Sequence, residues 1–170
     1  MNELHKQIVD CIPGLRRYSR ALTGGTDMAD DLVQDCLARA MDSLHLFKPG
    51  SNMRAWLFSI LHNQYVNNLR RSAIQPDALN LETVTEEKTG VPANQEQNLE
   101  IRDIREGLTL LPDEQRQVIL LVGLEGMSYA EAAEILGIPK GTVMSRLNRG
   151  REQLRSLMNG EKRPEIRRVK

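Results

Sequence analysis

The sequence predicts an all-α protein made of two small helical domains joined by a flexible linker. Aromatic residues are only 4% of the 170 residues, which is sparse for a β-sandwich or barrel. Apolar residues recur at helical spacing in two segments, 1–71 and 99–160, whereas residues 72–98 lose this periodicity. With 40% hydrophobic and 27% charged residues, both segments have a globular composition, and 170 residues suffice for two small cores.

The sequence shows no pattern of a secreted or membrane-spanning protein. Residues 118–124 form the longest apolar run, which is too short for a bilayer, and residues 1–6 contain no signal-peptide core. We therefore expect a cytoplasmic protein without membrane insertion. Cys11 and Cys36 are too few for a disulfide framework, and in a reducing compartment both are expected to be small core residues.

The formal net charge of zero hides a gradient along the chain. Residues 1–70 carry 8 Lys and Arg against 7 Asp and Glu, residues 71–138 carry 5 against 13, and residues 139–170 carry 10 against 3. A basic C-terminal block that includes a tail at 161–170 is the electrostatic pattern of a protein that meets phosphate. A solvated helix face followed by a charged tail would give the same count.

The first helical segment is interrupted by turn-forming residues at 13–14, 23–26 and 48–51. Thr26 or Asp27 is placed to cap a helix that runs to about Leu46. Its apolar positions form one stripe, and Asp31, Gln34 and Asp35 lie on the other side. That acidic side is either a solvated face or a docking face for a basic partner, and spacing alone leaves both readings open.

The next predicted helix starts after Ser51 or Asn52 and ends at about Arg71. Along one side it carries, at steps of four, three, four and three, Trp56, Ile60, Asn63, Asn67 and Arg70. An aromatic ring, amides and a guanidinium suit base stacking, base edges and phosphates. A core tryptophan with solvated amides is the simpler alternative.

Beyond this helix, residues 72–98 predict a flexible acidic linker, and helical periodicity resumes near residue 99. The strongest local pattern follows. Ser128 and Glu131 form a capping box, Gly137 marks a helix end, and a second helix begins after Pro139. Its outer face carries Lys140, Thr142, Ser145, Arg146, Asn148 and Arg149. Two helices with a short glycine-containing turn and a polar, basic outer face predict a DNA-binding helix-turn-helix rather than a plain helical hairpin.

Four segments together resemble the bacterial extracytoplasmic-function (ECF) sigma factors, in the order of that family and over nearly the whole chain. They are ADDLVQD at 29–35, FKPGSNMRAWL at 47–57, LPDEQR at 111–116 and YAEAAEILGIPKGTV at 129–143. The resemblance implies sigma region 2 at 1–71, the linker at 72–98, sigma region 4 at 99–160 and a basic tail at 161–170. It also implies a non-enzymatic promoter-specificity subunit of RNA polymerase that recognises and melts promoters.

The resemblance implies roles for individual residues as well. Asp31, Gln34 and Asp35 would dock the β′ subunit of the polymerase core, with the β subunit as a further partner. Binding of the minus-10 element would involve Phe47, Lys48, Ser51, Asn52, Trp56, Asn63, Asn67 and Arg70, with the loop at 47–52 holding a flipped base. Reading of the minus-35 element would involve Lys140, Thr142, Ser145, Arg146, Asn148 and Arg149.

One position departs from the family. Many members carry a basic residue where this chain has Met144, so base reading is expected to rest on Ser145 and Arg149. The linker of such factors threads into the RNA channel of the polymerase, and acidic residues there would mimic RNA. An anti-sigma factor is the expected regulatory partner, and the free chain is expected to be a monomer.

Three other classes of function explain the sequence less well. A dimeric helix-turn-helix regulator would explain the C-terminal segment but leaves the acidic face and the line from Trp56 to Arg70 without a role. A helical adaptor would bind a protein partner and no nucleic acid. An enzyme is disfavoured, because His5, His45 and His62 are scattered and the sequence shows neither metal-ligand spacing nor a phosphate-binding loop. For the same reason no cofactor or metal is expected.

Overall fold

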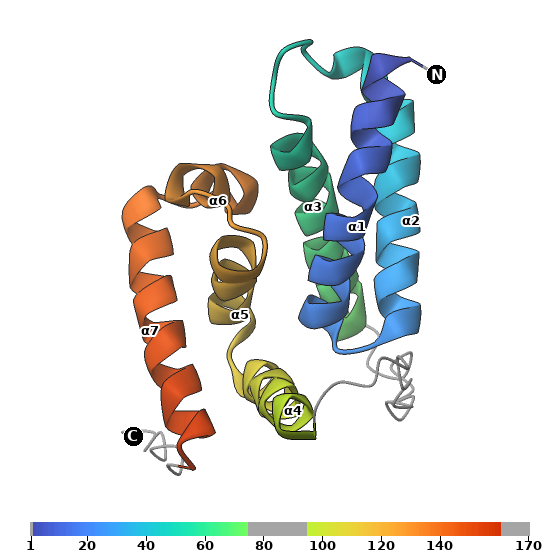
Figure 1. The fold of residues 1–170 in the computed structure, drawn as a ribbon. Helices are drawn as coiled ribbons and strands as arrows, with labels where there is room; N and C mark the ends of the chain where they lie inside the picture. Colours follow the sequence, from blue (N-terminus) through green and yellow to red (C-terminus); the bar gives the residue numbers. More distant parts are fainter. Residues whose placement is uncertain (1, 75–94, 161–170) are drawn as a thin grey trace.

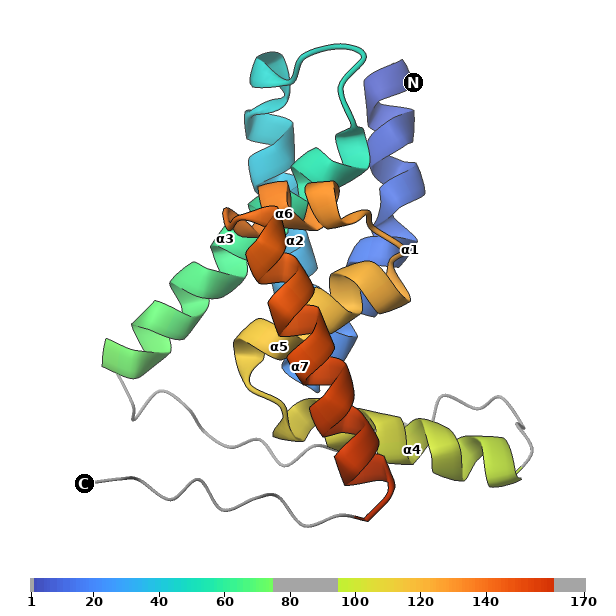
Figure 2. The same ribbon diagram turned by 90° about the vertical axis from the view of Figure 1, so that its left-hand side faces the viewer.

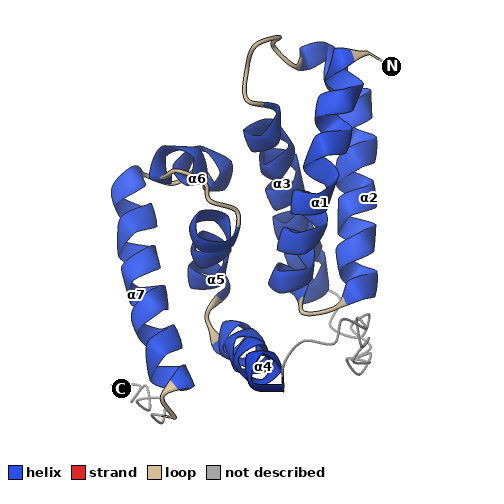
Figure 3. Cartoon of the chain, in the orientation of Figure 1, coloured by secondary structure: helices blue, strands red, loops and turns tan. Residues whose placement is uncertain are grey.

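The computed structural model describes residues 2–74 and 95–160, and every regular element in these two ranges is helical. This confirms the predicted all-α fold class. Figures 1 and 3 show two groups of helices side by side, one from the N-terminal and one from the C-terminal part of the chain. The predicted linker lies mostly, and the predicted basic tail at 161–170 entirely, outside the described residues.

The N-terminal lobe consists of α1 (Glu3–Thr23), α2 (Thr26–Asp42) and α3 (Met53–Ile74). The predicted interruption at Pro13 is wrong, because α1 runs through this proline without a break. Proline removes one backbone hydrogen bond from a helix interior. Here the helix is held on both sides of Pro13 by buried apolar residues, among them Ile8 and Leu15.

The predicted helix from Thr26 to about Leu46 is shorter in the structure. Gly25, not Thr26 or Asp27, is the N-cap of α2, and the helix ends at Asp42. A 3-10 turn, η1 (Leu44–Leu46), then leads into the loop at 47–52. Because α2 stops early, this loop can fold back to the start of α3, where the side chain of Asn52 accepts a hydrogen bond from the Ala55 amide at 3.1 Å.

At its other end α3 extends to Ile74, three residues past the predicted end. The helix α4 (Gln95–Leu110) also begins before residue 99. Both ends of the predicted linker, 72–74 and 95–98, are therefore helical.

The C-terminal lobe contains α4, α5 (Asp113–Ile119), a π-helical turn η3 (Leu120–Leu124), α6 (Tyr129–Leu136) and α7 (Lys140–Met158). The capping box is confirmed on its N-cap side, since the Ser128 hydroxyl accepts from the Glu131 amide at 3.1 Å. Gly137 ends α6 in the left-handed conformation, with φ of 66°, as a helix-terminating glycine does. The helical spacing of Val143, Leu147, Gly150 and Leu154 predicts that they face the neighbouring helices; on α7 the first three are buried and Leu154 is half-buried.

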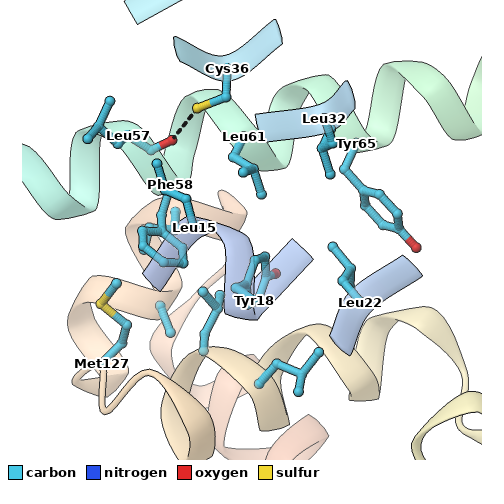
Figure 4. Close-up of a cluster of buried hydrophobic side chains, with 14 of the residues drawn as sticks. Leu15, Tyr18, Leu22, Leu32, Cys36, Leu57, Phe58, Leu61, Tyr65 and Met127 are labelled. Carbon is cyan, nitrogen blue, oxygen red and sulfur yellow. Dashed lines mark hydrogen bonds between the residues drawn. The ribbon is translucent and has the colours of Figure 1, made fainter. Parts of the chain in front are cut away.

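The two lobes share one apolar core. In Figure 4, Met127 lies beside Phe58 and Leu15, so a side chain between η3 and α6 packs on α1 and α3 of the other lobe. Leu121 is also fully buried in this cluster, and Tyr18 meets Phe58 edge to face at 5.3 Å between ring centroids. Within the described residues the lobes therefore pack as one body, with α3 against α6 and α1 against η3.

Gly150 allows α7 to approach α5 closely. A Cβ atom there would lie 2.7 Å from Ile119 Cδ1 and 3.3 Å from Gln115 Cβ. Gly141, in the first turn of the same helix, has no atom within 4 Å of such a position. We expect Gly150→Ala to be less stable than Gly141→Ala by about 1–3 kcal/mol, the usual cost of overpacking a core. Chemical denaturation of both variants measures this difference, and equal stabilities would show that α5 yields without cost.

Candidate nucleic-acid and polymerase interfaces

The acidic face predicted on α2 is exposed. Asp31, Gln34 and Asp35 all point to solvent, while Leu32 and Cys36, on the opposite side of the helix, are buried. Met28, one turn before Asp31, is 61% exposed, so the acidic side chains lie next to an apolar one. A face of this composition suits a partner that offers arginines together with apolar side chains.

Cys36 holds the other side of α2 in place. Its thiol donates to the Leu57 carbonyl at 3.4 Å, and burial raises the thiol pKa to about 12. A neutral, hydrogen-bonded thiol in the core is the structural role that the sequence predicted for this cysteine. Burial likewise raises the pKa of Cys11, which is half-buried on α1.

The loop at 47–52 has a buried anchor and an exposed rim. Phe47 is only 6% exposed and its ring lies 5.1 Å from the ring of Trp56, which is half-buried. Lys48 and Ser51 are exposed, and the Ser51 amide donates to the Lys48 carbonyl at 3.1 Å. The packing of Phe47 on Trp56 therefore anchors the loop to the domain core, and Lys48 and Ser51 form its solvent-accessible surface.

An open cavity of about 530 Å³ lies between the end of α2 and the middle of α3. It is lined by Arg39, Asp42, Ser43, Ile60, Asn63 and Gln64. The Gln64 side chain is buried, and its Oε1 accepts no hydrogen bond from any described residue. The cavity therefore combines a guanidinium, a carboxylate, a hydroxyl and two amides around one apolar side chain, a set that suits the edge and face of an unpaired base.

Three of the side chains predicted along α3 continue this surface. Asn63, Asn67 and Arg70 are exposed on the same side of the helix. The structure thus brings together the cavity and the outer side of α3, which share Asn63. Sequence reasoning missed Arg39, Asp42, Ser43 and Gln64, because it treated α3 alone and their proximity depends on how α2 packs against it.

On α7, four of the six predicted minus-35 residues are exposed: Lys140, Ser145, Asn148 and Arg149. The other two have partners within the lobe. Thr142 is half-buried, and its carbonyl accepts from the Ser145 hydroxyl at 3.1 Å. Arg146 is also half-buried and lies 3.7 Å from the carboxylate of Glu114 on α5. Figure 2 shows α7 running across the near side of the molecule, open along its outer face.

Sequence comparisons identify the class of protein. A family model described as the Sigma2 domain of PhyR matches residues 8–62, and one described as Sigma-70, region 4 matches residues 101–154. The ECF RNA polymerase sigma factor EcfG of Rhodopseudomonas palustris is 38% identical over 160 residues, which cover 92% of this chain and 86% of that protein. This chain belongs to the ECF sigma factors.

Other relatives of this sigma factor agree. The ECF sigma factor SigE of Mycolicibacterium smegmatis is 32% identical over 164 residues, and the match covers 92% of this chain and 61% of that protein. Among solved structures, RpoE in complex with the anti-sigma factor NepR from Bartonella quintana superimposes with a TM-score of 0.77 at 33% identity, covering 95% of this chain and 100% of that one. CnrH, solved with the cytosolic domain of CnrY, gives 0.69 at 26% identity, with coverages of 94% and 89%.

The resemblance drawn from the sequence is therefore confirmed. The chain is a promoter-specificity subunit of RNA polymerase, of a family whose members initiate transcription without catalysing a reaction themselves. The alternative of a dimeric regulator that acts without polymerase is not favoured by these matches. In the part of the chain that the structure describes, no helix is long and apolar enough to cross a bilayer.

Proposed function

We propose that this sigma factor binds the polymerase core through α2, reads and melts the minus-10 element with the α2–α3 surface, and reads the minus-35 element with α7. One observation carries the proposal most directly. The polar cavity in the N-terminal lobe and the basic face of α7 are separate surfaces that suit nucleic acid on the two lobes of one chain. A regulator that read DNA with its helix-turn-helix alone would have no use for the first surface.

For core docking, the acidic face of α2 supplies Asp31, Gln34 and Asp35 to arginines of the β′ subunit. Contacts across such a face are charge-assisted and exposed at their rim, so they steer association and fix its register. Met28 adds an apolar contact at the edge of the same face. We infer that the protein acts in the cytoplasm, where the polymerase is found.

Reversing the charge of this face tests docking. We expect Asp31→Lys together with Asp35→Lys to weaken binding to the polymerase core at least about tenfold, or ~1.4 kcal/mol, because attraction becomes repulsion. A titrated pull-down with purified core measures this. Asp10→Lys, on the exposed surface of α1, is the matched control and should bind as the wild type does. If the wild type, the double variant and Asp10→Lys bind the core equally, the acidic face of α2 does not dock the polymerase and is only a solvated surface.

For the minus-10 element, the loop at 47–52 and the cavity would hold a base taken out of the duplex. Unstacking costs a few kcal/mol, which a site must repay with stacking and hydrogen bonds. The lining of the cavity offers both, with Ile60 and the Arg39 guanidinium as stacking surfaces and the exposed Asn63 amide as a hydrogen-bonding group. Lys48 and Ser51 on the loop rim, with Arg70 along α3, are placed for the phosphates around it.

Asn63 is expected to set preference in the minus-10 element. Loss of its amide in Asn63→Ala should cost about 1–3 kcal/mol against the preferred base and relax selection there. Selection by holoenzyme from a pool randomised in both promoter elements measures it. Asn148→Ala on α7 is the reciprocal variant and should relax only minus-35 selection. If both variants return the wild-type minus-10 sequence, the cavity does not read a base.

For the minus-35 element, the exposed face of α7 would enter the major groove. Ser145 and Arg149 lie one helical turn apart near the middle of this face, where side chains reach base edges. Lys140, at the first position of the helix, is better placed for a phosphate, and Arg146 stands at the flank near Glu114. Met144 is 45% exposed on the other flank and offers an apolar surface in place of the basic residue of many relatives.

The two kinds of contact on α7 are expected to respond differently to salt and sequence. Arg149→Ala should cost about 1–3 kcal/mol and relax preference at one or two minus-35 positions. Lys140→Ala should weaken all promoters alike and flatten the salt dependence by about one unit of slope. Binding of holoenzyme to matched promoter variants at several salt concentrations separates these outcomes. The assignment is reversed if Lys140→Ala changes preference and Arg149→Ala does not.

An anti-sigma factor is the regulatory partner that we infer. RpoE and CnrH, which share this fold over most of their length, were solved in complex with the anti-sigma factor NepR and with the cytosolic domain of CnrY. A partner of that kind would act on a chain whose α2 and α7 faces are both open, and it would compete with polymerase by covering them.

A further inference from the structure

A buried carboxylate joins the two lobes. Glu125 follows the π-helical turn of the C-terminal lobe, and its side chain is 0% exposed. Arg17 on α1 donates to both of its carboxylate oxygens at 2.9 Å. Arg54 on α3 donates to the same carboxylate at 2.8 Å and to the Glu125 carbonyl at 2.6 Å. Two arginines of one lobe thus hold one residue of the other by its side chain and its backbone.

Local features of both lobes shape this contact. In η3 the Glu125 amide donates to the Leu120 carbonyl five residues back, which widens the helix before the chain turns into α6. On the opposite side Gly14 leaves room, because a Cβ atom there would lie 3.1 Å from Glu125 Oε2. Single π turns are rare and occur often at functional sites. The carboxylate therefore enters a space that fits it closely.

A second polar contact and the shared core close the rest of the interface. The Tyr65 hydroxyl on α3 donates to Asp113 Oδ1 at the start of α5 at 2.8 Å, and Arg116 pairs with the same carboxylate. Burial and this hydrogen bond raise the pKa of Tyr65 to about 12, so the phenol stays protonated at neutral pH. Met127 then packs on the apolar face of the N-terminal lobe (Figure 4).

This closed arrangement holds the minus-10 loop near the start of the helix-turn-helix. Arg54 follows Asn52 by two residues, at most about 7 Å, and Ser128 follows Glu125 by three, at most about 11 Å. With only an arginine side chain between these segments, the minus-10 loop and the start of the helix-turn-helix lie within about one turn of B-DNA, roughly 34–36 Å. The 20 residues between the end of α3 and the start of α4 would allow up to roughly 70 Å.

We propose that Glu125 is a latch that keeps the free sigma factor closed, and that Arg17 and Arg54 must release it before both lobes engage polymerase and promoter. The assembly half of this proposal rests on the proposed function, whereas the closed state of the free chain does not. In the closed state the acidic face of α2 remains exposed, so docking of the N-terminal lobe can precede release of the latch.

The charges explain why the latch is reversible. Arg17 and Arg54 keep 53% and 38% of their side-chain surface exposed, while the Glu125 carboxylate has none. When the lobes separate, water hydrates all three charged groups at once. The free energy of this hydration offsets much of the interaction energy lost when the ion pairs break. A partial opening that left the carboxylate buried without its arginines would be costly, so the interface is expected to be either closed or fully open.

Distances between the lobes in the free, full-length chain test the closed state. Spin labels on a keto-bearing amino acid at positions Arg16 of α1 and Glu152 of α7, both exposed, leave Cys11 and Cys36 in place. The wild type should give one short distance, and Glu125→Gln should add a longer component. Arg17→Gln changes an exposed side chain and should do the same. Asp30→Asn is the matched control, because it removes the exposed Arg20–Asp30 pair within one lobe.

Binding to purified core polymerase tests the role of the latch in assembly. The affinity of Glu125→Gln should rise by the same factor as its open fraction, while Asp10→Asn, on the exposed surface of α1, binds as the wild type does. The latch hypothesis is wrong if Glu125→Gln and Arg17→Gln both keep the wild-type distance while circular dichroism shows them folded. An opened Glu125→Gln with unchanged affinity overturns its role in assembly. Failure of the wild type to bind core would instead refute the proposed function, and the distances would still decide the closed state.

Discussion

The described structure depends on one apolar contact, that of Phe58 and its neighbours with Met127 and Leu121. Each lobe alone would have a small core, and small cores give little net stability. By sharing buried side chains, α1 and α3 of one lobe and the η3–α6 segment of the other form a single larger core. Apolar burial brings region 4 against region 2, and the pairing of Glu125 with Arg17 and Arg54 at the edge of this core holds the two lobes in that position.

The surfaces that we propose for binding other molecules lie away from this contact. The acidic face of α2, the cavity between α2 and α3 and the outer face of α7 are all open while the lobes are packed together. Their side chains differ in kind, with carboxylates on α2, amides at the cavity and basic groups on α7. One chain thus offers three chemically distinct surfaces, and this division suits a subunit that must hold an enzyme and two stretches of DNA.

Much of this could be predicted from the sequence. Helical periodicity, the capping box at Ser128 and the buried face of α7 depend on neighbours within a few residues, and all were correct. The continuity of α1 through Pro13, the early end of α2 and the late end of α3 were missed, because tertiary packing decides them. The cavity with Arg39 and Gln64 and the pairing of Glu125 with two arginines join residues far apart in the chain, which spacing cannot reveal.

The π turn at Leu120–Leu124 has a consequence for how this chain tolerates change in length. A π turn holds one residue more than the α-helical turn that it replaces, so deleting a residue there would restore a regular helix. Each residue of an α-helix turns the chain by about 100°. The shortened segment would present Glu125 and Met127 on a different side of the lobe, although every element on either side could still form. The length of this one segment thus sets the mutual orientation of the two lobes.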